Sequence, residues 1–210
     1  MILHDAIPTQ HQQVPSKPWP IPDVILCLGA FGGRFDQEMN NIYTLYTVGT
    51  LLRPRVVLMG LQNLVELINP GVGVLLPSST YQSAPYYCGL LPISNPVRCT
   101  SVGFTWNLGS QGEQDALLTT VQEHCGRTLH NDTTTGTETG SASHPEMGDT
   151  SAFAGTVMEF TGLISTNNIS NPVRIHETLA NALLVRCDRP LLYTSCISDT
   201  RAESSTSTCH

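Results

Sequence analysis

Residues 28–38, LGAFGGRFDQE, gather the groups that a protein needs to hold a phosphate. A glycine-rich turn that leads into a helix exposes free backbone N–H groups at the positive end of the helix dipole, and this end attracts anions. The Arg34 guanidinium could add a forked contact to phosphate oxygens, and the Gln37 amide could donate a hydrogen bond. These features predict a phosphate site in this turn.

A simpler interpretation of the same turn stays open. Gly29, Gly32 and Gly33 could serve only to permit a tight connection between a strand and a helix. Asp36 could serve only as the helix cap, and Arg34 could be solvated. The sequence has neither G-x-G-x-x-G nor G-x-x-x-x-G-K-S/T, the glycine patterns that bind nucleotide phosphates. Residue types alone therefore do not separate a phosphate site from a structural turn.

A second group of polar and aromatic residues lies further along the chain. VGFTWNL, residues 102–108, and GLISTNN, residues 162–168, could supply an aromatic face and hydrogen bonds for a flat ligand. Trp106 would suit a cationic ligand best, because a cation over an indole ring gains roughly 0.5–2 kcal/mol. The alternative is an ordinary core tryptophan on the inner face of a strand.

Composition excludes several other functions. The net charge is −7 and only 13% of the residues are charged, so no basic surface for nucleic acid is indicated. The seven histidines lack the H-E-x-x-H spacing of a zinc site. The seven cysteines are odd in number and form no C-x-x-C, which favours reduced thiols in a cytoplasmic protein. No segment reads as a signal peptide or a membrane helix, so we expect a soluble protein without a membrane partner.

The glycine turn lies inside a predicted β-α-β unit. VILCL, residues 24–28, is apolar at every position, which is typical of a strand buried on both faces of a parallel sheet. Apolar residues at helical spacing predict an amphipathic helix from Gln37 to about Val48, capped by Asp36. RVVLM, residues 55–59, predicts a second buried strand. A lone unit of this kind cannot cover both faces of its own sheet.

The character of the sequence changes near residue 70. Residues 61–69 fit either a helix or a strand. From Gly71 onward, short apolar or alternating segments are separated by Gly, Pro, Ser and Asn, which indicates an antiparallel β-sandwich or barrel. The predicted fold class is therefore α/β followed by all-β.

The predicted domain limits follow these changes. We expect a disordered lead-in over residues 1–21, part of an α/β domain over 22–70, a β domain over 71–198, and a disordered tail over 199–210. Within the β domain, about residues 109–152 are predicted to be a disordered insertion. The reason is that residues 131–151 are rich in Thr, Gly and Ser and nearly free of apolar side chains.

The order of the segments resembles one known family. GAFGGRFDQEMNNIYTLY, CGLLPIS, VGFTWNL, GLISTNN and DRPLLYT are similar to successive signatures of thiamine pyrophosphokinases. In that family GGRFDQ or GGRFDH, CGLIP or CGLLP, GLxWN or GLxWD, and STSN occur in this order. The resemblance covers about residues 23–108 and 160–197.

The resemblance implies a nucleotide-handling α/β domain followed by a thiamine-binding β domain, in a homodimer with clefts at the interface. The implied reaction transfers diphosphate from ATP to thiamine, with Mg²⁺ present, and releases AMP. It implies phosphate-site roles for Gly32, Gly33, Arg34, Asp36 and Gln37, with Arg34 stabilising transferred charge. It implies thiamine-site roles for Trp106, Asn107, Ser165, Asn167 and Asn168, where Asn167 replaces a serine of the family pattern.

One part of the family pattern is missing. Members carry acidic segments upstream of the first strand, whose carboxylates hold magnesium and the nucleotide, whereas only Asp5 and Asp23 precede Asp36 here. The metal ligands are therefore unknown, and we expect that the first half of the α/β domain is lacking. Two hypotheses remain: a thiamine diphosphokinase seen without its first half, or an inactive remnant that binds thiamine or dimerises without turnover.

Overall fold

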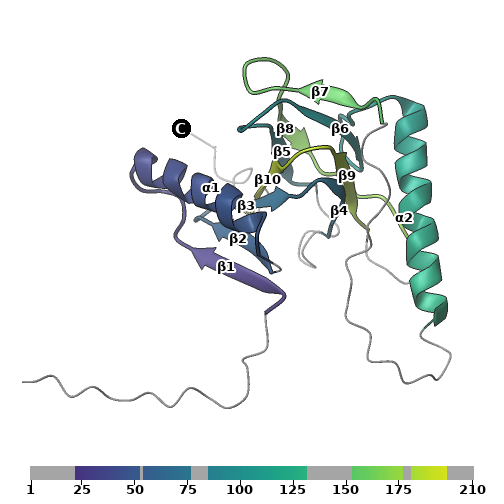
Figure 1. Cartoon of the computed structure of the whole chain (residues 1–210), viewed down its shortest axis with the longest axis horizontal. Coiled ribbons are helices and arrows are strands. Elements are labelled where there is room, and N and C mark those ends of the chain that lie inside the picture. Colours follow the sequence, from purple (N-terminus) through teal and green to yellow (C-terminus); the bar gives the residue numbers. More distant parts are fainter. Residues whose placement is uncertain (1–21, 53, 77–84, 132–152, 177–180, 198–210) are drawn as a thin grey trace, which may run out of the picture.

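The computed structural model describes residues 22–52, 54–76, 85–131, 153–176 and 181–197, which form two sheets and two helices (Figure 1). The first half contains β1 Val24–Leu28, α1 Phe35–Gly49, β2 Arg55–Met59, β3 Asn63–Ile68, β4 Gly71–Leu75 and β5 Tyr87–Leu91. The second half contains β6 Val97–Val102, α2 Gln111–Asn131, β7 Thr156–Met158, β8 Ser165–Ile169, β9 Leu183–Cys187 and β10 Leu191–Cys196. No helix among the described residues is both long and apolar enough to span a membrane.

The β-α-β unit forms as predicted. β1 pairs in parallel with β2, and α1 connects them. The inner face of α1 packs Leu45, which is 1% exposed, against the buried side chains of Leu58 and Val65. The apolar residues of α1 therefore cover one face of this end of the sheet.

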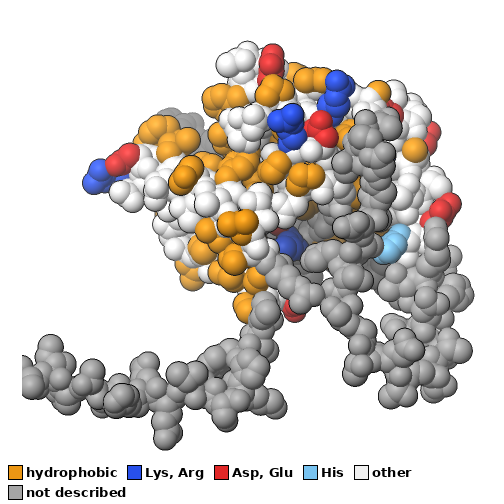
Figure 2. All heavy atoms as spheres, viewed as in Figure 1, with side chains coloured by type: hydrophobic (Ala, Val, Ile, Leu, Met, Phe, Trp, Pro, Cys, Tyr) orange, Lys and Arg blue, Asp and Glu red, His pale blue; other side chains and the backbone are white. Residues whose placement is uncertain are grey.

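Two details of this unit differ from the predictions. β1 is not buried on both faces, because it is the edge strand and α1 covers only one side of it. Val24, Leu26 and Leu28 on the other face are 49%, 52% and 73% exposed, and Figure 2 shows hydrophobic side chains at the surface in this region. Asp36 is not the helix cap. α1 begins two residues earlier than predicted, with Arg34 at the N-cap and Asp36 in the first turn.

The remaining strands are antiparallel, in agreement with the sequence. One sheet has the order β1-β2-β3-β10-β5-β8, and the other has the order β4-β9-β6-β7. The segment that fitted either a helix or a strand contains β3, which pairs with β10. Because β3 lies between β2 and β10, the six-stranded sheet continues across residue 70, and the boundary placed there stays a prediction.

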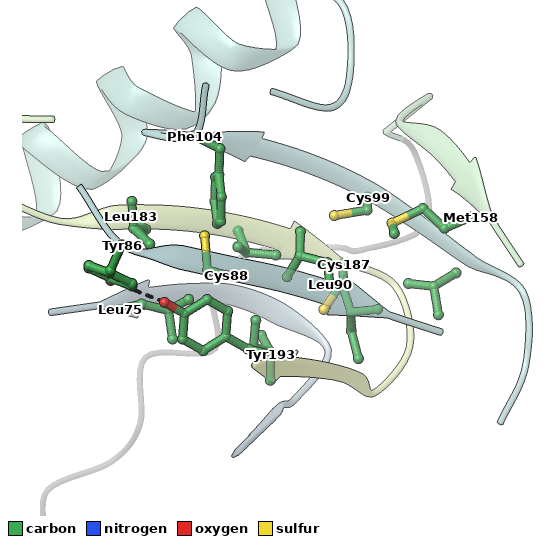
Figure 3. Close-up of a cluster of buried hydrophobic side chains, with 14 residues drawn as sticks. Leu75, Tyr86, Cys88, Leu90, Cys99, Phe104, Met158, Leu183, Cys187 and Tyr193 are labelled. Carbon is green, nitrogen blue, oxygen red and sulfur yellow. Dashed lines mark hydrogen bonds between the residues drawn. The ribbon is translucent and has the colours of Figure 1, made fainter. Parts of the chain in front are cut away.

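The two sheets share a hydrophobic core, as expected for a sandwich. Figure 3 shows side chains from both sheets meeting between them, with the hydroxyl groups of Tyr86 and Tyr193 joined by a hydrogen bond of 3.1 Å. Met158, Leu183 and Val97 are fully buried in this core. This packing fixes the strands whose ends and connections carry the polar groups.

The prediction of a disordered insertion over 109–152 is wrong for its first part. Residues 111–131 form α2, whose N-terminus has a capping pattern: Ser110 N–H and Oγ–H both donate to a Glu113 carboxylate oxygen. Leu117 and Val121 then pack against residues of the second sheet, including Leu184. Residues 132–152, like the predicted lead-in and tail, lie outside the described residues.

Leu183→Ala tests the shared core. Leu183 is fully buried between the sheets, so its truncation removes apolar contacts and leaves a cavity. We expect the free energy of unfolding to fall by about 2–5 kcal/mol, measured by urea denaturation. Val157→Ala, at a position 47% exposed in the same sheet, is the control and should cost less than about 1 kcal/mol. Similar losses in both variants would contradict this description of the core.

Candidate functional site

The glycine turn between β1 and α1 presents its backbone N–H groups to an anion that the chain itself supplies. Gly32 N–H and Gly33 N–H donate to the same Glu38 carboxylate oxygen, at 2.9 and 3.1 Å. Gly29 and Gly32 have φ values of 73° and 101°, which favour glycine. The turn therefore has the donor arrangement of an anion site, and two of its glycines are also required by the backbone.

The charged side chains of this turn lie at the surface. Arg34 donates from Nε and Nη2 to the two carboxylate oxygens of Asp36, at 3.0 and 2.5 Å, and both side chains are more than half exposed. Gln37 is exposed beside them in the first turn of α1. This pair holds the guanidinium at the helix N-terminus, where a phosphate oxygen could replace the carboxylate as its partner.

The second predicted group of residues is brought together by hydrogen bonds. Asn168, which is 2% exposed, accepts from Trp106 N–H through Oδ1 and donates through Nδ2 to Trp106 O and Ser165 Oγ. Its Oδ1 also accepts from Ile169 N–H. The amide therefore uses its full hydrogen-bonding capacity within the chain. It joins β8 to a segment 62 residues earlier.

Trp106 has a fixed backbone and an exposed ring. Its side chain is 60% exposed, which excludes the alternative of a core tryptophan on an inner strand face. The neighbouring turn is closed by Asn107, whose Oδ1 accepts from Phe104 N–H at 3.0 Å, while Phe104 itself is buried in the core. An exposed indole on a fixed backbone suits a flat ligand, and it suits a cationic ring best.

Comparisons with known proteins indicate which proteins this chain is similar to. No family model matches the sequence. Over 85 residues the chain is 36% identical to thiamine pyrophosphokinase 1 of Oryza sativa subsp. japonica, and over 87 residues it is 33% identical to thiamine pyrophosphokinase 1 of Arabidopsis thaliana. These matches cover 40% and 41% of this chain and 31% of each relative. Over this stretch the chain is similar to thiamine pyrophosphokinases.

Solved structures share the fold of this chain. A thiamin pyrophosphokinase from Candida albicans matches 85% of the chain with a TM-score of 0.55 and 19% identity, and the match covers 46% of that protein. A thiamine pyrophosphokinase from Bacillus subtilis matches 83% of the chain with a TM-score of 0.51 and 16% identity, over 56% of that protein. The matched part is thus about a third of the curated relatives and about half of these two structures.

The two groups of predicted residues occupy different parts of the thiamine pyrophosphokinase-like fold. Figure 1 shows the β1–α1 turn at one end of the molecule, whereas β8 lies in the sandwich. No hydrogen bond or ion pair joins the two groups among the residues that the structure describes. The predicted residues thus form two separate clusters within the described part of the chain, and their roles as binding sites stay predictions.

Two residues that shape the glycine turn were missed by sequence reasoning. Glu38 accepts the two glycine N–H groups, and the Asn41 amide donates to Ala30 O at 2.8 Å. The available signal was a carboxylate in the first turn of a predicted helix, where it favours the positive end of the dipole. A phosphate bound at Gly32 and Gly33 would have to displace the Glu38 carboxylate.

The described residues do not form a magnesium site. No three His, Cys, Asp or Glu side chains converge among them, and the Asp36 carboxylate is engaged by Arg34. Mg²⁺ prefers several oxygen ligands in octahedral geometry.

Glu113, at the start of α2, gives a pH-dependent prediction. Hydrogen bonds from Ser110 and Gly155 N–H hold the pKa of this carboxyl below its usual value. Because the folded pKa is lowered, the contribution of Glu113 to stability is present above about pH 4.5 and is lost as the pH falls through the folded pKa.

We expect Glu113→Gln to lower the free energy of unfolding by about 1 kcal/mol at pH 7, and by less at pH 3.5, in urea titrations. Glu123→Gln, further along the same helix, is the control. If Glu113→Gln lowered the free energy of unfolding by the same amount at both pH values, the stabilising role of the Glu113 carboxylate would be contradicted.

Proposed function

We propose that this chain takes part in thiamine diphosphokinase chemistry, in which diphosphate passes from ATP to the thiamine hydroxyl and AMP leaves. The observation that carries the proposal is Trp106: an exposed indole whose backbone is fixed on both sides, in a chain similar to thiamine pyrophosphokinases. The thiazolium ring of thiamine is a cation, and an aromatic face attracts cations.

The proposed thiamine site consists of Trp106, Asn107, Ser165, Asn167 and Asn168. Of these, Trp106 would contact the ligand through its ring. Asn168 would act by holding the Trp106 backbone, because its amide has no hydrogen-bonding group left for a ligand. The Asn107 Oδ1 is likewise occupied by Phe104 N–H, which leaves its amide NH₂ as the group that could reach a ligand.

The proposed phosphate site consists of Gly32, Gly33, Arg34, Asp36 and Gln37. Phosphoryl transfer depends mainly on positioning and on neutralising charge, and the Arg34 fork can do both once a phosphate replaces Asp36 as its partner. Competition from Asp36 and Glu38 would favour a guest with more negative charge than a single carboxylate. A polyphosphate such as ATP fits this requirement.

A homodimer is part of the proposal. The phosphate and thiamine groups are not in contact within the described part of one chain, and a second copy could bring the two kinds of site together. Sedimentation equilibrium should then give a mass near twice 22.8 kDa. A cytoplasmic location stays a prediction from the sequence.

Product analysis tests the proposed reaction. The full chain is incubated with thiamine, ATP and Mg²⁺, and the nucleotides are separated by chromatography. Diphosphate transfer predicts AMP and thiamine diphosphate in equal amounts. Formation of ADP and thiamine monophosphate would contradict the proposed transfer, and thiamine binding without any product would favour the hypothesis of a binding protein without turnover.

A further inference from the structure

Strand β8 contains one residue more than the part of β5 that faces it. Cys88 pairs with Asn168 and Leu90 pairs with Ser165, so two steps along β5 correspond to three steps along β8. The extra residue makes a β-bulge, within which Asn167 has a left-handed backbone with φ of 55°.

The bulge changes which side chains lie together. In a regular strand, residues three apart point to opposite faces of the sheet. Here Ser165 and Asn168 are three apart, yet Asn168 Nδ2 donates to Ser165 Oγ at 3.1 Å. The same Asn168 amide makes both hydrogen bonds to the Trp106 backbone. The two hydrogen bonds that fix the Trp106 backbone therefore depend on the bulge.

Gly89 makes room for this bulge. A Cβ at Gly89 would lie 3.0 Å from Ser165 O and 3.1 Å from Oγ1 of Thr194, its partner on β10. Both distances are shorter than ordinary van der Waals contacts, and the first is to backbone, which cannot turn away as a flexible side chain can. A side chain at position 89 would push β8 away at the position where it bulges.

Asn167 suits the left-handed conformation by its residue type. Asn adopts positive φ several-fold more often than most residues, whereas a β-branched residue there is a genuine outlier. Asn167 is exposed, and it stands where the family pattern has a serine. Its backbone conformation accounts for its presence without any contact with a ligand.

We propose that Gly89 and Asn167 are positioning residues: they make the β8 bulge, which brings Asn168 beside Ser165 and orients the Asn168 amide toward the Trp106 backbone. Asn167 acts through its backbone and not through a side-chain contact. The identity of the ligand, thiamine, rests on the proposed function. The positioning of the Trp106 backbone by Asn168 does not.

The test compares Asn167→Gly with Asn167→Val in full-length chain that carries Trp19→Phe, so that Trp106 is the sole tryptophan. Glycine keeps the left-handed backbone, whereas valine opposes it. Two quantities are measured: the thiamine dissociation constant, and acrylamide quenching of Trp106 fluorescence without ligand. Thr166→Val, at the exposed neighbouring position, is the matched control.

We expect Thr166→Val to stay within about twofold of the parent in both measurements, and Asn167→Gly to change both measurements less than Asn167→Val does, since glycine does not oppose the bulge. Asn167→Val should weaken thiamine binding about tenfold and change the quenching constant, because the strained backbone releases Asn168. Gly89→Ala should change the thiamine dissociation constant and the quenching constant in the same directions as Asn167→Val. If Asn167→Val does not fold, Asn167→Ala takes its place in the test. Alanine also disfavours positive φ, but it adds less steric bulk than valine.

Two results would overturn the proposal. An equal loss of thiamine affinity in Asn167→Gly and Asn167→Val would show that the side chain contacts the ligand. Unchanged Trp106 quenching in a folded Asn167→Val would show that the bulge does not hold Trp106. If the parent does not bind thiamine, the proposed function fails, and the quenching comparison alone still decides whether the bulge positions Trp106.

Discussion

Arg34→Ala should lower the rate of thiamine diphosphate formation by at least about a hundredfold, while the thiamine dissociation constant changes less than about twofold. The guanidinium is the one cation in the glycine turn, and its forked geometry suits the oxygens of a transferring phosphate. Its loss removes charge stabilisation from the transition state but touches no residue of the thiamine group. Single-turnover and equilibrium measurements on the same variant separate the two effects.

Arg55→Ala is the matched control for Arg34→Ala. Arg55 also forms a surface ion pair, with Glu66 across β2 and β3, and its side chain is 56% exposed. Because it lies outside both predicted groups, its removal should change the rate less than about twofold. Arg34→Lys keeps the charge without the fork and should fall between the parent and Arg34→Ala. Equal losses of rate and thiamine affinity in Arg34→Ala would contradict its role as a phosphate ligand.

Trp106→Ala should weaken thiamine binding by at least about tenfold, since it removes both the stacking surface and the cation–π attraction. Trp106→Phe keeps an aromatic face and should lose less. The ring is largely exposed, so neither change should lower the free energy of unfolding by more than about 1 kcal/mol. Isothermal titration calorimetry and urea denaturation check the two statements.

Phe160→Ala is the control for Trp106→Ala. Phe160 is another exposed aromatic residue, 59% accessible, on the connection between β7 and β8. Its removal should leave thiamine affinity within about twofold of the parent if the attraction is specific to Trp106. A comparable loss in both variants would show that exposed aromatic surface in general binds the ligand.

The part of the fold with strong local signals was predictable from sequence. Apolar runs and helical spacing located β1, α1 and β2, and the turn-rich segments after residue 70 indicated antiparallel strands. α2 was missed although Ser110 and Glu113 form a capping pattern before Leu117 and Val121. The threonine-rich stretch that follows the helix hid this signal.

The arrangement within the sites was less predictable, because it depends on residues far apart in the sequence. The sequence motifs placed Arg34 and Trp106 in two separate groups, and the roles of both residues stay predictions. The pairing of Cys88 with Asn168 and of Leu90 with Ser165, which makes the bulge, is a property of two strands together and cannot be read from either strand alone. For the same reason, the sequence did not show that Asn168 holds the Trp106 backbone or that β1 has an exposed face.

The measurement that tests the central claim most directly is a titration of the full chain with thiamine and, separately, with thiochrome, its uncharged oxidation product. We expect saturable binding of thiamine, with quenching of Trp106 fluorescence in full chain that carries Trp19→Phe, and binding of thiochrome weaker by about fivefold or more, because the cation is absent. No saturable binding of thiamine, or equal affinity for the two compounds, would contradict the claim that the exposed Trp106 ring is the face that receives thiamine.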